Sequence, residues 1–459
     1  MTATSTTTLS IDRLRDDLAG RVIVPGDADY DEARTVMAGG IDRRPAAIVR
    51  VANTADVARV VNVARETGSE LAVRSGGHSG AGHSTTDGGI VIDLRDLKEI
   101  DLDVGARHVW AGAGLTAGEV GAAITPHGLV VGFGDTASVG IGGITTGGGV
   151  GYLVRRDGLT IDNLIGAEVV TADGTVLTVD ADNHPDLFWG IRGGGGNFGV
   201  VTKFHYRLNE LPAFYGGMLV LPATAETVAG FIAAAEAAPE ELSTIANIMT
   251  APPMPFLPEE AVGSIVILGM IGFAGDAEAG ERAVAPFRAL AEPLADFVAA
   301  GPYSVMFPEM EGGDDYHPTA AAVNLHIDHV DRDVASTIVE FLEKSDAPLR
   351  AAQLRVLGGA MARVPADATA YAHRSSRIMV NLAAFYEGPD DKAAKEAWVR
   401  DFAAAIDQGD RAVYSNFLGD EGTARVRDAY PGSTWDRLVE IKRRYDPTNL
   451  FRLNQNVTP

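Results

Sequence analysis

The sequence predicts an α+β protein with two lobes, and three observations lead to this expectation. The chain has 459 residues, more than a single hydrophobic core usually holds. Strand-like and helical segments alternate over residues 1–208, where most of the 53 glycines lie. Beyond Leu211 and Pro212, alanine-rich helical stretches alternate with apolar, strand-like runs such as SIVILGMIGF. This alternation of helical stretches with apolar runs predicts an antiparallel sheet covered by helices.

The first lobe begins with a predicted strand–helix–strand unit over residues 45–79. An apolar run comes first, apolar residues at helical spacing follow, and a second apolar run ends in glycines. Further strands are predicted along the lobe: a buried strand over 88–94, a hairpin over 167–179 that turns at Asp173-Gly174, and a half-buried strand over 200–208. The first lobe should therefore be a mixed α and β structure.

The end of the chain is expected to return to the first lobe. It contains a helical segment over 434–445, a break at Asp446-Pro447 and a polar tail. We therefore assign residues 1–208 and 418–459 to the first lobe, with its core at about 40–212, and residues 209–417 to the second. No internal repeat is visible, which argues against solenoids and propellers.

The charge balance argues against nucleic acid and anionic membrane surfaces as partners. The formal net charge is -24 and the pI is near 4.7, whereas phosphate groups are bound by clustered Lys and Arg. Residues 136–154 are uncharged over about the length of a membrane span, but they are rich in glycine. We expect a loop there and no membrane helix. The N-terminal residues show no secretory signal, so the cytoplasm is the expected location.

The cysteine and histidine content limits which catalytic and metal sites the chain can form. The chain has no cysteine, which excludes disulfides, thiolate metal sites and cysteine nucleophiles and favours a reducing compartment. His326 and His329 are the closest approach to a metal-ligand spacing, and we interpret them as a structural pair. No metal is expected.

Three glycine-rich loops point to a bound dinucleotide: residues 74–89, 132–153 and 192–201. Glycine lets successive backbone amides point at one anion, and no side chain keeps the ligand away. The loops lack the GxGxxG spacing of the Rossmann fingerprint, so a different architecture must hold the dinucleotide. The Gly-Lys pair of the phosphate loop, the GxSxG elbow and the HExxH motif are all absent from the sequence.

Five short motifs occur in a fixed order along the chain. They are RSGGH (74–78), VG followed by GGGVG (139–140 and 147–151), HPDLFW followed by RGGGGNFG (184–189 and 192–199), YSNF (414–417), and YDPTNLF with NQN (445–451 and 454–456). In this order they resemble the FAD-linked oxidoreductases of the berberine bridge enzyme type, within the vanillyl-alcohol-oxidase superfamily. The resemblance covers nearly the whole chain.

The resemblance implies a PCMH-type FAD-binding domain formed by residues 1–208 and 418–459, and a substrate-binding domain formed by 209–417. It further implies that the ring of His78 is linked to the 8α-methyl carbon of the flavin. The residues it places around FAD are Arg74, Ser75, Gly76, Gly77, His78, Ser79, His83, Ser138, Val139, Gly140, Gly143, Gly148, Gly149, Gly151, Val200, Asn454 and Asn456.

Two positions depart from the family pattern. Many relatives carry a second link, from a cysteine shortly before the Val-Gly pair, and Thr136 occupies that place here. The flavin is therefore expected to be attached through His78 alone. Val150 stands where several relatives have a tyrosine beside the flavin.

For catalysis, the resemblance assigns Tyr414 as the candidate base and Asn416 to positioning of the flavin or substrate. A tyrosinate can act as a base where nearby donors or positive charge lower its pKa. A structural tyrosine that packs on the flavin ring is the alternative. Phe417, where some relatives have a second tyrosine, cannot be a base. Tyr152 and Tyr371 remain possible pocket residues.

The expected reaction is two-electron oxidation of a small organic substrate, an alcohol, sugar or secondary metabolite, by hydride transfer to flavin N5. In the resembling family, a valine at Val139 goes with access of O2 to the flavin, which favours an oxidase that forms H2O2. The alternatives are a dehydrogenase with another electron acceptor, a non-covalent FAD hydroxyacid dehydrogenase, and a non-catalytic flavin-binding protein.

Overall fold

The predicted strand–helix–strand unit opens the first sheet of the protein. In the computed structural model, which describes residues 9–307 and 317–459, this unit is β2 (Ala47–Arg50), α3 (Thr54–Thr67) and β3 (Leu71–Arg74). Helix α3 begins where the Asn53 side chain accepts a hydrogen bond from the Asp56 amide, and it ends at Gly68 in the left-handed conformation. The sheet is completed by β1 (Arg21–Ile23) and β4 (Ile90–Asp93), in the order β1-β2-β4-β3, and flanked by α1 (Ile11–Asp17) and α2 (Tyr30–Arg34).

A second, antiparallel sheet carries the predicted hairpin. Its strands are β5 (Ile100–Asp103), β6 (His108–Gly112), β8 (Leu164–Val170), β9 (Val176–Asp180) and β10 (Val200–Arg207), in the order β5-β6-β10-β8-β9. Around it lie α4 (Ala117–Ile124), α7 (Pro185–Gly190) and the short pair β7 (Leu129–Val130) and β11 (Asn209–Glu210). We call these two sheets and their helices the N-terminal lobe.

The glycine-rich stretch 136–154 is not the loop that we predicted. It contains helix α5 (Ile141–Gly147) and leads into α6 (Val154–Asp157). Helix α5 stops because Gly148 and Gly149 take φ values of 132° and 80°, which side-chain-bearing residues rarely adopt. Among residues 9–307 and 317–459, no helix is long and apolar enough to cross a membrane.

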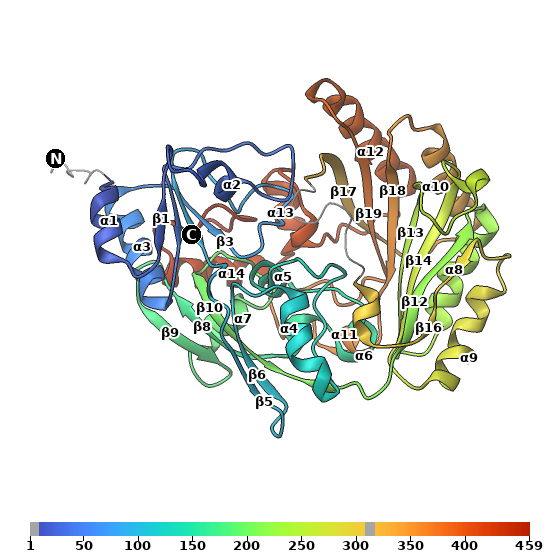
Figure 1. The fold of residues 1–459 in the computed structure, drawn as a ribbon, viewed down its shortest axis with the longest axis horizontal. Helices are drawn as coiled ribbons and strands as arrows, with labels where there is room; N and C mark the ends of the chain where they lie inside the picture. The colour runs from blue at the N-terminus through green and yellow to red at the C-terminus, as the bar shows by residue number, and fades with distance from the viewer. Residues whose placement is uncertain (1–8, 308–316) are drawn as a thin grey trace.

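An eight-stranded antiparallel sheet forms the second lobe, which we call the sheet lobe (Figure 1). Its long strands are β12 (Tyr215–Pro222), β13 (Leu242–Thr250), β14 (Ile265–Phe273), β17 (Ala320–Ile327), β18 (Arg350–Val356) and β19 (Ile378–Phe385). The order is β15-β12-β14-β13-β18-β19-β17, with β15 (Ala295–Asp296) and β16 (Ala299–Ala300) beside β12. The predicted α+β fold is confirmed.

The two faces of this sheet differ. Helices α8 (Ala225–Ala237), α9 (Ala277–Arg288), α10 (Arg332–Lys344) and α12 (Lys392–Ile406) cover one face and bury an apolar core with it. The other face lies toward the N-terminal lobe, which it contacts through residues of β18 and through α11 (Ala360–Arg363) packed on α6. Any site between the lobes is therefore walled by this second face.

The end of the chain packs into the N-terminal lobe, as Figure 1 shows for α13 (Thr423–Ala429) and α14 (Ser433–Tyr445). Residues from Val413 to Val457 share one buried apolar cluster with residues of both N-terminal sheets. The fully buried Lys442 ammonium donates to Asp446 at 2.7 Å and to the carbonyls of Asn197 and Phe451, both at 2.8 Å. This lysine holds the C-terminal turn against the third glycine-rich loop.

Candidate active site

The first two glycine-rich loops touch each other through their backbones. A Cβ atom at Gly76 would lie 2.3 Å from the Gly140 nitrogen, and one at Gly140 would lie 2.2 Å from the Gly76 nitrogen. Ser75 Oγ joins the loops further, because it donates to the Ala113 carbonyl at 2.6 Å and accepts from the Gly142 amide at 3.2 Å. Only glycine at both contact positions allows this approach.

The first loop presents a run of free backbone amides. Within residues 9–307 and 317–459, the amides of residues 76–80 donate no hydrogen bond to another protein group. Several amides that follow one another without partners suit the oxygens of a pyrophosphate. The loop is partly exposed, and Gly76 and Gly80 are open to solvent. The backbone here fits a dinucleotide such as FAD.

The third loop joins the same region and is closed by the C-terminal segment. The amides of Gly193 and Gly195 donate to the Thr146 carbonyl at the end of α5. Asn197 donates to the Gln455 carbonyl at 3.0 Å and accepts from the Val457 amide at 2.8 Å. Within residues 454–457, two polar atoms are buried without a partner among the described residues, Asn454 Oδ1 and Asn456 Oδ1. Such acceptors fit a bound cofactor that carries donors.

His78 lies where the first two loops meet. Its Nε2 is 3.4 Å from Ser138 Oγ, and its ring is half-buried. Burial lowers the pKa of His78, although the contact with Ser138 and the nearby Asp135 carboxylate work in the opposite direction. The imidazole is therefore neutral at neutral pH, which is the nucleophilic form.

His83 has a different environment in the same loop. Burial, with the charge of Arg43, lowers the pKa of His83 to about 4. The Arg43 guanidinium donates to the carbonyls of Gly82 and Thr85, both at 2.9 Å. His83 is thus a neutral residue in a loop braced by an arginine.

The other predicted cofactor residues lie around these loops. Val200 begins β10, Gly151 packs against the Phe133 and Gly134 carbonyls, and Gly143 is exposed with open space beside its Cα. Arg74 braces the first loop from inside the protein. Its guanidinium is buried and donates to the carbonyls of Ala33 and Ser84, with Asp93 at 3.8 Å. The structure therefore gives Arg74 a bracing position, and its contact with the cofactor stays a prediction.

Tyr414 lies against the end of α5, just before the short helix η7 (Ser415–Phe417). Its hydroxyl oxygen accepts from the Gly149 amide at 3.0 Å and from Asn416 Nδ2 at 2.9 Å. Glycine at position 147 leaves room for the Asn416 carboxamide, since a Cβ atom there would lie 2.1 Å from Asn416 Oδ1. Tyr414 and Asn416, which are predicted as a pair, are therefore in direct contact.

The pKa of Tyr414 differs from our expectation. Burial raises it above its ordinary value, and this outweighs the opposite effects of Asn416, the Gly149 amide and Arg355. Both donors still point at the phenol oxygen, so they stabilise its deprotonated form once the proton has left. The ring of Tyr371 lies 6.2 Å from that of Tyr414, and the Tyr371 hydroxyl is buried without a partner among the described residues.

The sheet face opposite Tyr414 carries a row of carboxamide side chains in cross-strand register. The row runs over four neighbouring strands, with Asn247 on β13, Gln353 on β18, Asn381 on β19 and Asn324 on β17. Gln353 donates to Asn247 at 2.9 Å, and Asn324 accepts from the Tyr414 amide at 2.7 Å. The buried Asn381 Oδ1 has no partner within the described part of the chain. Neutral hydrogen-bonding groups therefore form a row on the second sheet face, next to Arg355 on β18.

Sequence reasoning missed this polar face. Gln353 and Arg355 alternate with Ala352, Leu354 and Val356 in an otherwise buried strand. This alternation is the signal that could have predicted them. One face of the strand packs on helices and needs apolar side chains, so polar side chains at alternate positions indicate that the other face meets a polar environment. His326 on β17 follows the same rule: its Nδ1 donates to the Ala412 carbonyl at 2.9 Å, and its Nε2 is buried without a partner among the described residues.

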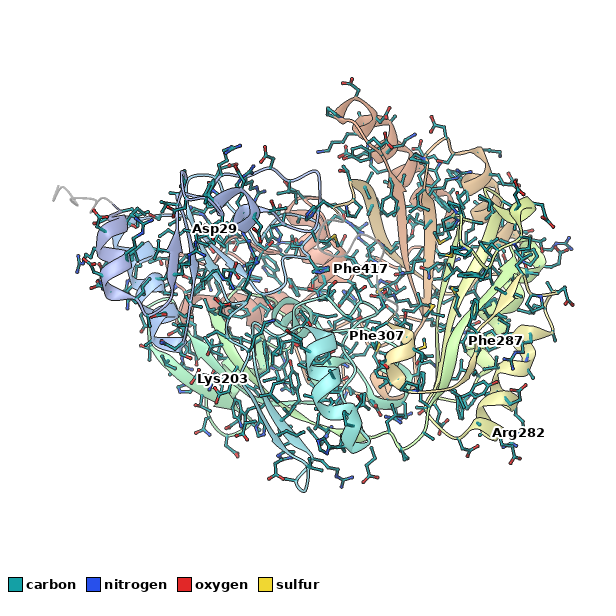
Figure 2. All side chains as sticks on the ribbon, in the orientation of Figure 1. Asp29, Lys203, Arg282, Phe287, Phe307 and Phe417 are labelled. Atoms are coloured by element: carbon teal, nitrogen blue, oxygen red, sulfur yellow. The ribbon has the colours of Figure 1, made fainter. Side chains whose placement is uncertain are left out.

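Phe417 marks the centre of this region. Figure 2 shows it between the two lobes. The Arg355 guanidinium carbon lies 5.3 Å from the centre of the Phe417 ring, and the Tyr414 ring meets the same ring edge-on at 5.1 Å. The sheet lobe and the glycine-rich loops therefore converge on one set of aromatic side chains.

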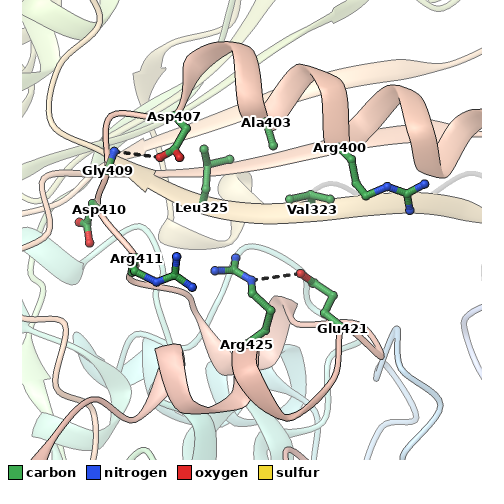
Figure 3. A pocket seen from close by; sticks show the side chains of 10 residues that line it. All are labelled: Val323, Leu325, Arg400, Ala403, Asp407, Gly409, Asp410, Arg411, Glu421 and Arg425. Carbon is green, nitrogen blue, oxygen red and sulfur yellow. Dashed lines mark hydrogen bonds and ion pairs between the residues drawn. The ribbon is translucent and has the colours of Figure 1, made fainter.

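A separate cavity of about 350 Å³ lies between the edge strand β17, the end of α12 and α13 (Figure 3). Three arginines line it, Arg400, Arg411 and Arg425, together with three acidic residues, Asp407, Asp410 and Glu421. Arg411 and Arg425 both pair with Asp428, and Arg400 lies 3.9 Å from Glu396. These charges are neutralised within the protein, so the cavity does not have the character of an anion site. In residues 9–307 and 317–459, no three His, Asp or Glu side chains are placed to hold a metal ion.

Comparison with known families gives two matches along the chain. Residues 45–180 match the family described as "FAD binding domain". Residues 413–458 match the family described as "Berberine and berberine like". The first range contains the first two glycine-rich loops, and the second contains Tyr414, Asn416 and the C-terminal segment.

Individual relatives cover nearly the whole chain. The (R)-6-hydroxynicotine oxidase of Paenarthrobacter nicotinovorans is 30% identical over 96% of this chain and 97% of its own. The xylooligosaccharide oxidase of Thermothelomyces thermophilus is 28% identical over 90% of this chain and 87% of its own. Among solved structures, 6-hydroxy-D-nicotine oxidase of Arthrobacter nicotinovorans superposes with a TM-score of 0.85 at 28% identity, over 96% of this chain and 98% of the other.

Proposed function

The chain belongs to the berberine bridge enzyme-like family of FAD-linked oxidoreductases, and from that membership we propose that it is an oxidase of a small, uncharged, hydroxyl-bearing molecule. Oxidation removes two electrons and two protons from the substrate, and O2 takes them up to form H2O2. Bound FAD supplies the two-electron chemistry. The residues of this chain supply the binding, the orientation and the proton transfer.

One observation carries the proposal: Tyr414, held by two donors, lies between the glycine-rich loops and the carboxamide row of the sheet lobe. A substrate bound there would have its oxidised carbon on the loop side and its polar groups on the sheet side. Such an interlobe position is usual for ligand sites.

Tyr414 is the proposed base. Its phenol oxygen has the Asn416 amide and the Gly149 amide as fixed donors, so it can take a substrate hydroxyl proton without reorganisation of its surroundings. Because burial raises the pKa of Tyr414, proton abstraction should become faster as the pH rises toward that pKa.

The carboxamide row supports an uncharged substrate. Carboxamides donate and accept hydrogen bonds but carry no charge, so they suit hydroxyl groups better than ammonium or carboxylate groups. Asn381 is the member whose buried acceptor has no partner in the described part of the chain. The names of two relatives state 6-hydroxynicotine and xylooligosaccharides as their substrates, so the family itself leaves the substrate class open.

His78 is proposed as the covalent tether of FAD. The neutral imidazole at the junction of two glycine-rich loops supports this role, and the chain contains no cysteine for a second link. Val139 lies beside Gly140 at the same junction, half-buried, and we propose that it leaves O2 a path to the flavin.

Two measurements test the oxidase proposal. Purified holoenzyme is screened with alcohols, sugars and aromatic amines, and H2O2 is detected by a coupled peroxidase. Enzyme reduced photochemically is then mixed with air-saturated buffer in a stopped-flow instrument. Rapid return of the oxidised flavin spectrum, slowed in Val139→Leu, is expected for an oxidase. Slow return with wild type, together with turnover only with an artificial acceptor, identifies a dehydrogenase instead.

A further inference from the structure

Arg355 is a buried cation at the junction of the two lobes. It projects from β18, and only 4% of its surface is exposed. Its Nη2 donates to Asp135 at 2.5 Å and to Gln353 at 2.7 Å, and its Nη1 donates to the Val150 carbonyl at 2.9 Å. Asp135 and Val150 belong to the N-terminal lobe, so one guanidinium crosses the gap between the lobes.

Two short paths join Arg355 to Tyr414. The first runs through the backbone: Arg355 binds the Val150 carbonyl, and the amide of the preceding Gly149 donates to the Tyr414 hydroxyl. The second runs through Phe417, whose ring lies 5.3 Å from the guanidinium carbon and 5.1 Å from the Tyr414 ring. The guanidinium therefore fixes the turn that carries a donor of the phenol oxygen.

Within residues 9–307 and 317–459, Asp135 is the carboxylate that pairs with Arg355, and the other titratable groups near Tyr414 are Tyr371, Arg374 with Asp162, and His326. Tyr371 packs on the ring, and behind it Arg374 is paired with Asp162 at 2.7 Å. His326 lies on β17, next to the segment that leads into Tyr414. Burial lowers the pKa of His326 to about 4, so this imidazole is uncharged near neutral pH.

We propose that Arg355 is a positioning residue for Tyr414: it holds the Gly149–Val150 turn against the phenol and places a positive charge near the oxygen that gives up and takes the substrate proton. Asp135 sets how much of that charge Tyr414 senses, because it is the carboxylate partner of Arg355. The inference rests on the proposed role of Tyr414 as the base.

The test measures Tyr414 directly and uses no substrate. Holoenzyme is labelled with ¹³Cζ-tyrosine, the Tyr414 resonance is assigned by its loss in Tyr414→Phe, and its shift is followed as the pH is raised. Arg355→Met should raise the midpoint by about one pH unit or more, since an opposite charge nearby favours the ionised form. Asp135→Asn should lower the midpoint, because Arg355 then keeps its charge without a carboxylate partner.

Opposite signs are the decisive feature. A purely structural role for the ion pair would move both variants in the same direction or leave both unchanged, and either result overturns the proposal. Arg355→Lys keeps the charge and should remain close to wild type. If Arg355→Met does not fold, Asp135→Asn alone decides the sign. The proposal is also contradicted if Tyr414 stays protonated in both wild type and Asp135→Asn up to the pH of alkaline unfolding. A peroxide screen that finds no turnover would not change the outcome of this titration, because the titration uses no substrate.

Discussion

His78 and His83 share one glycine-rich loop but differ in what surrounds them. His78 lies at the contact between two loops, beside Ser138, whereas His83 lies beside Arg43. Both imidazoles are neutral, so charge does not distinguish them as nucleophiles. Position does, because only His78 lies at the backbone contact of Gly76 and Gly140, beside the free amides of its own loop.

The tether is tested by replacing each histidine in turn. Acid precipitation of wild type and of His83→Ala should give a yellow pellet, because a covalent flavin stays with the denatured chain. His78→Ala should give a colourless pellet and a yellow supernatant, or protein without flavin. A colourless wild-type pellet would refute covalent attachment.

His326 makes the stability of the protein depend on pH. Its ring is fully buried, and burial lowers its pKa to about 4, below the unfolded value near 6.5. The unfolded chain therefore binds the proton first as the pH falls, and stability is lost between about pH 6.5 and 4. The loss attributable to this residue is on the order of 3 kcal/mol.

The prediction is checked by urea unfolding at several pH values. His326→Gln should lose less stability than wild type between about pH 6.5 and 4, since its side chain does not titrate there. His329→Gln is the control, because it removes an exposed imidazole just beyond the end of β17 and leaves the buried His326 in place. Parallel curves for wild type and His326→Gln would contradict the assignment.

At the scale of elements, helices and hairpins with local sequence signals were predicted well. Features that depend on contacts between distant parts of the chain were not. The hairpin of β8 and β9 follows from the turn residues Asp173-Gly174, and α3 follows from its apolar spacing and cap. Helix α5 was missed because its glycines favour a loop. Tertiary contacts stabilise it instead: its Gly142 amide donates to Ser75, and the amides of Gly193 and Gly195 donate to its Thr146 carbonyl.

The same contrast holds for the candidate site. His78, Tyr414 and Asn416 belong to short motifs and could be found in the sequence. The carboxamide row could not, because its members come from four strands and meet only through the register of the sheet. Register depends on the whole set of strand pairings, which a single sequence does not display.

Helix α14 depends on one buried ion pair. Lys442 and Asp446 are both fully buried, and Lys442 also satisfies two backbone carbonyls. Lys442→Met would leave a buried carboxylate unpaired, which typically costs about 3–5 kcal/mol. Chemical unfolding should show this loss, together with weaker retention of FAD. Lys344→Met removes an exposed pair with Glu340 on α10 and should leave the unfolding midpoint nearly unchanged.

At the scale of the whole molecule, buried polar contacts tie the two lobes together. Arg374, from the segment before β19, donates to both carboxylate oxygens of Asp162 in the N-terminal lobe, at 2.7 and 2.8 Å. Arg155 of the N-terminal lobe donates in return to the carbonyls of Ala235 and Leu242 in the sheet lobe. Relative motion of the lobes would break these bonds, so the two lobes are expected to keep a fixed position relative to each other.

Arg374→Met tests this coupling. The variant leaves the buried Asp162 carboxylate without its partner, and we expect a loss of about 3 kcal/mol or more in stability. Calorimetry should also show a broader transition or two separate ones, because the lobes then unfold less cooperatively. Arg377→Met is the matched control: its exposed pair with Glu236 lies within the sheet lobe. Equal effects of the two variants would argue against interlobe coupling.

The return of residues 413–457 to the N-terminal lobe also sets an order of events during synthesis. The ribosome synthesises β12 to β19 before the C-terminal residues that close the third glycine-rich loop. The sheet lobe can therefore fold while the N-terminal lobe still lacks this C-terminal segment. A nascent chain stalled before Val413 lacks Tyr414 and the Asn197 partners in the C-terminal segment. Capture of FAD, and any covalent link to His78, would then be one of the last steps in making the protein.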